Sequence, residues 1–400
     1  MGLRLVSVVG LVAFLALAWA LSENRRAISW RIVAWGLALQ FALALVILRA
    51  GFAEPIFNAV RAVIGVLTDA TVAGAEFVFG PLADPGDAIL AFHVLPVIIL
   101  VSALSAMLYQ LRIIQGVVHA MAWVMRRTLK TSGAETFGAA LLVFLGIESV
   151  TALRGYISNM TRSELCVLMT AFMATIAGSV MVVYAAFGAE PGHLMTASLI
   201  SAPAAILIAK MMVPETAIPE TQEAGRIELP VETYNVVDAA AKGAGEGLKL
   251  ALNVAAMLIA FIGLVYLLNL LAETLTGQPF TYYMGLLFLP FAWLMGVPMQ
   301  DVSTLAGLLG TKTVLNEFLA YAELQALIAE GALEPRSVMV ATYALCGFAN
   351  PGSLGILIAG LSSLMPDRRS EIVQLGLKAF VGGTLAAFTT ACVAGIIGNV

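Results

Sequence analysis

Long apolar runs recur along the whole chain and constrain its fold more than any other feature. About eight of them reach roughly 20 residues, the length that a helix needs to cross the hydrocarbon core of a bilayer. Hydrophobic residues make up 60% of the 400 residues and charged residues only 12%, against about 25% charged in a typical soluble domain. We therefore expect an all-α polytopic membrane protein, and we exclude an ordinary soluble enzyme and a disordered chain.

The apolar pattern divides the chain into several kinds of segment. We expect transmembrane spans at residues 3–21, 30–47, 89–108, 165–187, 194–213, 248–271, 338–361 and 374–397. Amphipathic or charge-interrupted segments, which should lie on the membrane surface, are 53–79, 115–130 and 280–297. Residues 132–155 and 301–331 are apolar but interrupted, which is typical of re-entrant helical hairpins. The polar stretch 214–247 is predicted to be a loop.

Basic residues are distributed unevenly between the two sides that this layout defines. With the N-terminus outside, sixteen Lys and Arg residues fall on the inner side and five on the outer side. The positive-inside rule favours this orientation, so both termini are expected on the outer, periplasmic side. The formal net charge of −4 leaves no basic surplus for a phosphate backbone, and we expect no nucleic-acid partner.

Two parts of the chain share an internal pattern. An Arg-Ser pair begins a span at Arg162 and again at Arg336, and in both cases a Gly-Ser pair follows sixteen residues later. A surface segment and a hairpin with a glutamate near its middle, Glu148 or Glu317, precede each pair. The first hairpin should enter from the inside and the second from the outside. Such an inverted repeat is the signature of secondary transporters.

The two hairpin glutamates are the strongest candidates for function. A carboxylate at membrane depth costs roughly 2.5–3.5 kcal/mol or more unless it is paired or faces water. Glu148 and Glu317 are therefore functional candidates by default. The structural alternative is a position in the headgroup region at the end of a hairpin.

A polar run with a proline interrupts the span at 338–361. Pro351 lacks an N–H donor, so the helix should break there and free backbone groups for a ligand. Asn350 would add an amide donor and acceptor. In the first repeat, the Thr175 hydroxyl and carbonyls near Ile176 could hold a small cation, or Thr175 could bond back to its own helix. The sequence has no nucleophile–base pair and no Cys/His metal cluster, so we expect neither an enzyme, nor a cofactor, nor a transition-metal site.

Several motifs are similar to those of one transporter family. In the second half they are Gly310-Thr311-Lys312-Thr313, Asn316-Glu317-Phe318-Leu319-Ala320-Tyr321 and Ala341-Thr342-Tyr343-Ala344-Leu345-Cys346-Gly347-Phe348-Ala349-Asn350. In the first half they are Ser132-Gly133-Ala134-Glu135, Met160-Thr161-Arg162-Ser163-Glu164-Leu165 and Ala174-Thr175-Ile176-Ala177-Gly178-Ser179. On these motifs the chain resembles the concentrative nucleoside transporter family of bacterial type, from about Ser105 to Asn399.

The resemblance implies a cation-coupled symporter that imports nucleosides across the inner membrane by an elevator movement. It also implies a homotrimer in the lipid bilayer, in which each protomer has a scaffold and a mobile transport unit. Residues 1–112 and 248–279 would then form the scaffold, and 214–247 a cytoplasmic loop. The two repeats of the transport unit would be 113–213 and 280–400. The coupling ion would be sodium or a proton.

The resemblance also implies substrate-binding residues. In the family, the second hairpin and the broken helix after it hold the ribose. The matching positions here are Glu317, Asn350 and Ser353, with Phe348 nearby. Val180 falls where the family has a residue against the nucleobase.

The first hairpin departs from the family pattern, which reads Gly-Gln-Thr/Ser-Glu-Ala-Pro. Here the sequence is Gly146-Ile147-Glu148-Ser149-Val150-Thr151. We expect Glu148 to be the hairpin glutamate and Ser149 a second polar contact, while Ile147 replaces the base-facing glutamine. A site without that amide would discriminate bases differently. The alternative substrate is therefore an altered-base nucleoside or another ribosyl compound.

The cation site of the family also differs here. Sodium-coupled members place an asparagine where this chain has Leu142. The remaining oxygen donors would be those of Leu145, Thr175 and Ile176. A hard cation prefers several oxygen ligands, so proton coupling is favoured over sodium. Burial disfavours the charged form of a carboxylate, which makes the two hairpin glutamates candidate proton carriers. A channel, which would need a continuous polar pore, is a remote alternative.

Overall fold

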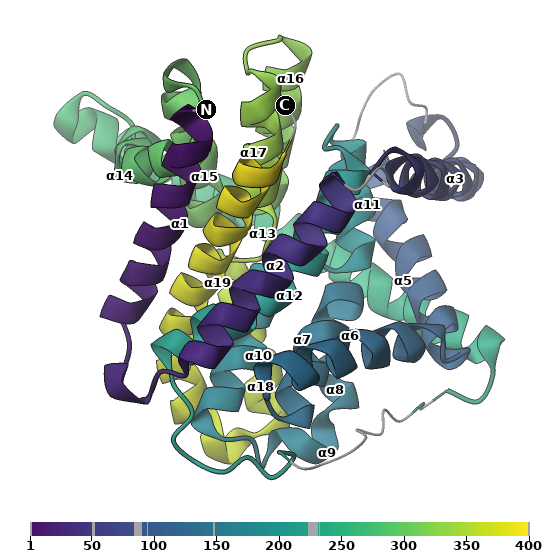
Figure 1. Ribbon diagram of the computed structural model, residues 1–400. Coiled ribbons are helices and arrows are strands. Elements are labelled where there is room, and N and C mark those ends of the chain that lie inside the picture. Colours follow the sequence, from purple (N-terminus) through teal and green to yellow (C-terminus); the bar gives the residue numbers. More distant parts are fainter. Residues whose placement is uncertain are drawn as a thin grey trace.

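The structure is a computed structural model that describes residues 2–49, 53–83, 90–93, 95–146, 149–222, 231 and 233–398. The regular elements within these residues are helices (Figure 1). Seven of the described helices are long and apolar enough to cross a membrane. The number is eight if the bent pair α5 (Leu95–Gln110) and α6 (Ile113–Leu129) is one span. These findings confirm the predicted all-α polytopic membrane fold.

The chain opens with two long apolar helices and a third that lies across them. These are α1 (Gly2–Ala20), α2 (Trp30–Leu48) and α3 (Ala53–Phe79), with η1 (Arg25–Ala27) between the first two, and η2 (Gly80–Ala83) and α4 (Leu90–His93) after them. α1 and α2 run up the page in Figure 1, whereas α3 is seen almost end-on. Length and composition would allow α3 to span a membrane, but its orientation agrees with the surface helix predicted for this segment.

The first repeat has the predicted order of surface helix, hairpin and broken span. It comprises α6, α7 (Gly133–Leu145), α8 (Ser149–Ala152), α9 (Arg154–Ile157), α10 (Arg162–Ala174), α11 (Gly178–Ala186) and α12 (Pro191–Met212). α6 bends by 75° from α5. Val118 and Ala122 on one face of α6 are fully buried, while Trp123 is exposed, as the amphipathic pattern predicts. The predicted span at 165–187 is interrupted between α10 and α11.

The second repeat has the same order and lies the other way up. It comprises α14 (Phe280–Leu294), η4 (Met299–Asp301), α15 (Val302–Val314), α16 (Glu317–Ala329), α17 (Pro335–Leu345), α18 (Pro351–Leu364), η5 (Pro366–Arg368) and α19 (Arg369–Ile397). In Figure 1, α9 lies at the lower end of the molecule and α16 reaches its upper end. The two hairpins therefore approach from opposite sides, as an inverted repeat requires.

The two Arg-Ser pairs begin α10 and α17 through different contacts. Thr161 and Glu164 form a capping box at the start of α10. Arg162 then pairs with Glu23 at 2.8 Å, and this hydrogen bond lowers the pKa of the Glu23 carboxyl. Arg336 instead donates to main-chain carbonyls, among them that of Gly296 at 2.8 Å. The repeat is thus preserved in helix order more than in individual contacts.

The loop before α13 is shorter than predicted. α13 runs from Val236 to Thr276, so the end of the predicted loop 214–247 is helical. The Asn235 side chain accepts hydrogen bonds from the N–H groups of Val237 and Asp238, the second and third residues of the helix, and thereby caps its start. Within the stretch assigned to the loop, Gly247 packs on α5, because a Cβ there would lie 2.8 Å from Ser102 Cβ. Small residues of this kind allow two helices to approach closely rather than ending one of them.

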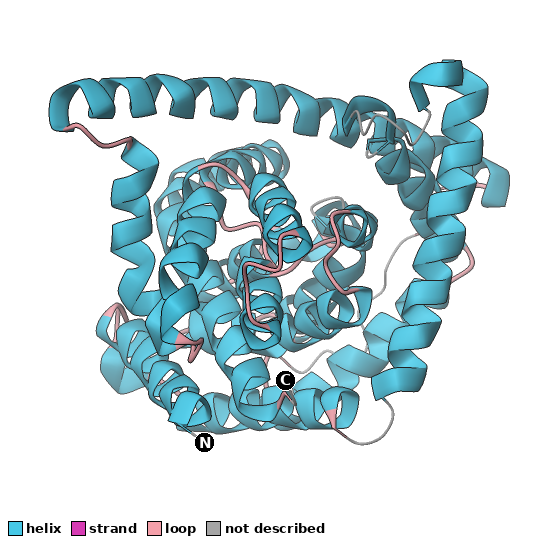
Figure 2. Cartoon of the chain, turned by 90° about the horizontal axis from the view of Figure 1, so that it is seen from above, coloured by secondary structure: helices cyan, strands magenta, loops and turns pink. Residues whose placement is uncertain are grey.

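The core of the molecule lies in the repeats. The apolar windows of the α10–α11 span and of α12 are 89% buried, against 28% for α1 and 11% for α13. Seen from above, a central group of helices is enclosed by long helices around its edge (Figure 2). α1 packs along α19 and α2 along α12, whereas α5 pairs with α13. The division into a scaffold and a transport unit stays a prediction.

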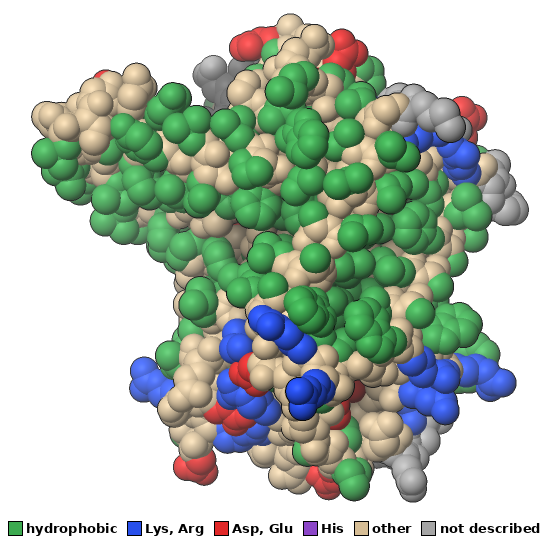
Figure 3. All heavy atoms as spheres, turned by 60° about the vertical axis from the view of Figure 1, so that its left-hand side comes forward, with side chains coloured by type: hydrophobic (Ala, Val, Ile, Leu, Met, Phe, Trp, Pro, Cys, Tyr) green, Lys and Arg blue, Asp and Glu red, His purple; other side chains and the backbone are tan. Residues whose placement is uncertain are grey.

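The surface separates charged from apolar regions. Lys and Arg side chains gather toward the lower end of the view in Figure 3, and hydrophobic side chains cover most of the face above them. This separation is the one that the positive-inside rule describes at the sequence level.

Candidate functional site

The breaks of the two repeats lie against each other. Gly347, in the break between α17 and α18, has a φ of +137°. A Cβ at this position would lie 2.8 Å from the carbonyl oxygen of Met173 and 2.9 Å from that of Ala174, at the end of α10. The rings of Phe172 and Phe348 are 5.4 Å apart across the same junction. A glycine is therefore needed where the two broken helices meet.

Glu317 is held at this junction by both repeats. It is the first residue of α16, and 1% of its surface is exposed. Tyr184 Oη of α11 donates to Glu317 Oε1 at 2.9 Å, and Asn350 Nδ2 donates to Glu317 Oε2 at 2.6 Å. A buried carboxylate is costly unless it is hydrogen-bonded. These two donors therefore fix the carboxylate in one orientation.

Asn350 has two structural roles. Its Oδ1 accepts the N–H of Ser353 at 2.8 Å and so caps α18, which begins at Pro351. Its Nδ2 points at Glu317 and also lies 3.1 Å from Ser353 Oγ. One side chain thus both caps α18 and binds the Glu317 carboxylate. This agrees with the helix break predicted at Pro351.

A buried lysine belongs to the same cluster of polar side chains in the second repeat as Glu317 and Asn350. Lys312 of α15 is 1% exposed, and its Nζ donates to the Ala344 carbonyl at 2.8 Å. Ala344 belongs to the last turn of α17, whose carbonyls have no partners within the helix. Lys312 therefore stabilises the end of α17 by hydrogen bonding and by its charge. It also attracts Glu317 electrostatically.

A cavity opens beside Glu317 and has two chemically different halves. The polar half is lined by Asn316, Glu317, Asn350 and Ser353. The other half is lined by Gly146, Phe172, Ala177, Val180 and Phe348. Glu317 and Ser353 line both halves, as do Leu250 and Val254 of α13. The second half has about 490 Å³ of empty space, part of which is open to solvent.

The residues predicted for the substrate fall into two groups. The structure brings Val180, Phe348, Asn350 and Ser353 together around Glu317. Three hairpin residues cannot be placed in this way. Ile147 and Glu148 lie outside the described residues, and Ser149 begins α8 while its side chain lies outside them.

Thr175 and Ile176, two of the residues predicted for a cation, already take part in hydrogen bonds. Thr175 Oγ1 donates to the Ala171 carbonyl at 2.8 Å, the second of the two arrangements considered for it. Ser198 Oγ donates to the Ile176 carbonyl at 3.1 Å. Leu145 ends α7 and is half-buried. The break in the first repeat therefore offers few free oxygens among these groups.

Tyr184 is the functional candidate that the sequence did not single out. Its ring stacks on Tyr321 with centroids 4.4 Å apart and meets Phe318 edge-on at 5.1 Å. Tyr184 lies four residues after Val180, on the same helix face. That spacing was the available signal, because a phenol hydroxyl buried in an apolar helix needs a partner.

The arrangement defines a class of protein. A buried carboxylate and amide lie at the junction of two inverted repeats that contain broken helices and re-entrant hairpins. This is the construction of secondary transporters, and here it has an elevator-type fold.

Sequence comparison identifies the family within that class. The chain matches the family described as Na+ dependent nucleoside transporter, its C-terminal part over residues 193–395 and its N-terminal part over 9–82. Residues 91–191 match a family described as nucleoside recognition. The chain belongs to the concentrative nucleoside transporter family, whose members are membrane transporters and not enzymes.

Individual relatives agree with this assignment. The chain is 38% identical to solute carrier family 28 member 3 of Mus musculus, over 99% of this chain and 59% of that protein. It thus spans about three-fifths of that relative's length. It is 40% identical to an uncharacterized transporter of Haemophilus influenzae, over 98% of this chain and 97% of that one. CNTnw in an inward-facing substrate-bound state is 33% identical with a TM-score of 0.92, covering 99% of both chains. A CNTnw variant in an outward-facing state gives a TM-score of 0.93 at 33% identity, covering 99% of this chain and 98% of that one.

Proposed function

We propose that this protein is a cation-coupled symporter that imports nucleosides across the inner membrane. The observation that carries the proposal is Glu317, which donors from both repeats hold in a cavity with a polar and an apolar half. A carboxylate in this position accepts hydrogen bonds from ribose hydroxyls, and such charge-assisted bonds are strong. Ser353 adds a hydroxyl beside it.

The apolar half of the cavity suits a nucleobase. Val180 and Phe348 line it, with Phe172 behind Phe348. Flat aromatic ligands pack well on such side chains. Apart from Glu317 and Ser353, which it shares with the polar half, the described lining of this half is apolar, which favours packing against the base over hydrogen-bonded selection of one base.

We favour a proton over sodium as the coupling ion. Leu142 is fully buried and supplies no ligand side chain. Its carbonyl accepts the N–H of Gly146, and those of Ala171 and Ile176 accept hydroxyl groups. Sodium would have to displace these bonds to gather several oxygens. The family description and the mammalian sodium/nucleoside cotransporter 1, 38% identical, support the sodium alternative, so the experiment must separate the two ions.

The remaining parts of the proposal concern assembly and movement. We propose a homotrimer with both termini on the periplasmic side, an orientation that places the Lys- and Arg-rich end inside. Within each protomer, the repeats 113–213 and 280–400 would move as the transport unit against a scaffold that includes α5 and α13. The hairpin glutamates Glu148 and Glu317 would carry the proton in that movement.

Uptake into proteoliposomes tests the proposal. Labelled uridine and adenosine are supplied with either an inward proton gradient or an inward sodium gradient, and Glu317→Gln serves as the inactive control. Accumulation by the wild type under the proton gradient alone supports the full proposal. Accumulation under the sodium gradient alone would overturn the proton assignment, and absence of accumulation under both would overturn the transport of these nucleosides.

A related substrate is the second candidate. It is favoured by Ile147, which replaces an amide of the family pattern, and by the apolar lining of the base half of the cavity. Competition by a panel of nucleosides, free bases and other ribosyl compounds separates the two cases. Competition by a ribosyl compound but by no nucleoside would favour the second candidate.

A further inference from the structure

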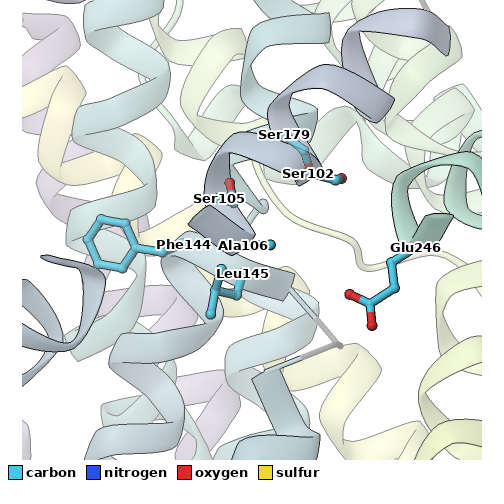
Figure 4. Close-up of a pocket in the computed structure, with 7 residues that line it drawn as sticks. All are labelled: Ser102, Ser105, Ala106, Phe144, Leu145, Ser179 and Glu246. Carbon is cyan, nitrogen blue, oxygen red and sulfur yellow. The ribbon is translucent and has the colours of Figure 1, made fainter. Parts of the chain in front are cut away.

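A second polar cavity lies where α5 and α13 face the first repeat (Figure 4). It has about 400 Å³ of empty space, part of which is open to solvent. Its lining comprises Ser102, Ser105 and Ala106 of α5, Phe144 and Leu145 of α7, Ser179 of α11, and Glu246 of α13. Figure 4 shows the Glu246 carboxylate pointing from α13 into the gap. Groups from the proposed scaffold and from the proposed transport unit thus line one cavity.

This cavity is separate from the substrate cavity but adjoins it. Gly146 and Val180 line the substrate cavity, whereas their chain neighbours Leu145 and Ser179 line the second one. At the end of α7 and within α11, consecutive residues therefore line the two cavities. Leu145 is also one of the residues predicted for the coupling ion.

Glu246 is an exposed residue of α13, and close packing of α13 on α5 places it beside the cavity. A Cβ on Gly243 would lie 2.6 Å from Ala106 Cβ, and one on Gly247 would lie 2.8 Å from Ser102 Cβ. Both neighbours, Ala106 and Ser102, line the cavity. Glu246 therefore projects beside a helix contact that its two flanking glycines make possible.

The polar groups of this cavity have no partners among the described residues. Ser179 is 7% exposed, yet its hydroxyl makes no hydrogen bond within that part of the chain, and neither do those of Ser102 and Ser105. Hydroxyls on the neighbouring α12 behave differently, since Thr196 and Ser201 bond back to their own helix at 2.6 and 2.7 Å. A buried hydroxyl that faces a cavity without a partner is available to a ligand.

We propose that this cavity binds the coupling cation on the scaffold side, with Glu246 as its charged ligand. The inference rests on the proposed function and adds a site to it. Three hydroxyls and one carboxylate form an oxygen-rich set suited to a hard monovalent cation or to a proton held with water. The lining from α5, α7 and α11 carries no charge, and Lys242 and Lys249 of α13 are not part of the lining. The ligands belong partly to the proposed scaffold and partly to the proposed transport unit. The complete set therefore exists in only one arrangement of these two parts.

Cation-dependent uptake by two matched variants tests the site. Glu246→Gln removes the charge with little change in shape, and Glu273→Gln makes the same change at an exposed position on the same helix. Uridine uptake is measured against sodium concentration and, separately, against external pH, together with uridine counterflow at equal saturating cation on both sides. For Glu246→Gln we expect the half-saturating concentration of the coupling cation to rise roughly tenfold, with counterflow unchanged. Glu273→Gln should behave as wild type.

The outcomes separate this inference from the proposed function. Wild-type cation dependence in Glu246→Gln, or equal loss of uptake and counterflow, would overturn the cation site while leaving nucleoside transport intact. If Glu246→Gln fails to fold, Ser179→Ala takes its place with the same expected direction. If the wild type takes up no nucleoside, the proposed function fails. The site is then tested by two binding measurements on the wild type and on Glu246→Gln. One is calorimetric titration with sodium chloride, with choline chloride as the control, and the other is proton release. A signal that Glu246→Gln abolishes supports the site, and identical signals from both proteins overturn it.

Discussion

The helix breaks of the two repeats are alike in position and unlike in chemistry. Between α17 and α18, Asn350 caps the start of α18 and binds Glu317, while Lys312 binds the last turn of α17. Between α10 and α11, Thr175 bonds back to its own helix, and Ala177 begins α11 without a side-chain cap. At the second break the buried polar side chains bind one another, whereas at the first the buried Thr175 hydroxyl bonds to the backbone of its own helix.

The first repeat places its buried charges elsewhere. Glu135, near the start of α7, pairs with Lys210 of α12 at 2.7 Å, and both side chains are almost fully buried. Lys210 also lies 3.0 Å from Glu215. These charges join the ends of elements instead of facing the cavity. The comparison indicates that the two copies of a duplicated fold can place their buried charges differently, one beside the cavity and the other at the ends of its helices.

The largest effect is expected for Glu317→Gln. An amide there would turn a donor toward either Tyr184 or Asn350, which are themselves donors, and would remove the charge. We expect nucleoside uptake to be abolished while the trimer still forms, as measured by proteoliposome uptake and by size-exclusion chromatography with light scattering. Glu330→Gln, at the exposed end of the same helix, is the control. Normal uptake by Glu317→Gln would contradict the role of the second break.

The next effect should be on stability and comes from the contact between the breaks. Gly347→Ala combines a positive φ with a Cβ 2.8 Å from a carbonyl oxygen, at a cost of roughly 1–3 kcal/mol. Gly178→Ala, in the break of the first repeat, meets one carbonyl oxygen at 3.3 Å with no such backbone constraint. Thermal unfolding in detergent should show a lower Tm for Gly347→Ala than for Gly178→Ala. Equal Tm values would mean that the two breaks are equally tolerant.

Asn350 variants separate capping from binding at the second break. Asn350→Ser keeps a capping hydroxyl but loses the amide donor to Glu317, whereas Asn350→Ala loses both. We expect uptake affinity to fall roughly tenfold in both variants, and stability to fall by a further ~1 kcal/mol in Asn350→Ala alone. Substrate titration and thermal unfolding of the two proteins provide the check. Wild-type affinity in Asn350→Ser would show that the amide is not needed.

The smallest effect is expected where the first repeat reaches the second. Tyr184→Phe keeps the ring stacked on Tyr321 but removes the hydrogen bond to Glu317. A loss of about 0.5–1.5 kcal/mol predicts a few-fold weaker affinity. Tyr321→Phe is the matched control, because its hydroxyl binds the Thr342 carbonyl at 2.7 Å and not Glu317. The contribution of the first repeat would be refuted if both variants lost affinity equally.

The sequence predicted the architecture well because its signals are local. Apolar length predicted α1, α2 and α12, and Pro351 predicted the second break. The start of α13 was misplaced because Gly243 and Gly247 were assigned to a polar loop, and only their neighbours on α5 reveal a packing role. Tyr184 was missed for a similar reason. Its partner Glu317 is 133 residues away, and sequence spacing carries no information about that distance.

Glu317 can also be described by the hydrogen-bond acceptor positions that remain unoccupied on its carboxylate. A carboxylate offers about four lone-pair directions, two on each oxygen. Tyr184 occupies one on Oε1 and Asn350 occupies one on Oε2, so one remains on each oxygen. Under the proposed function, the vicinal 2′- and 3′-hydroxyls of a ribose supply one donor for each. A 2′-deoxyribose keeps only the 3′-hydroxyl of this vicinal pair and leaves the other oxygen buried with an empty acceptor position, which costs about 1–3 kcal/mol. Under the proposed function, the side chains that orient the carboxylate thereby also determine how many sugar hydroxyls can donate hydrogen bonds to it.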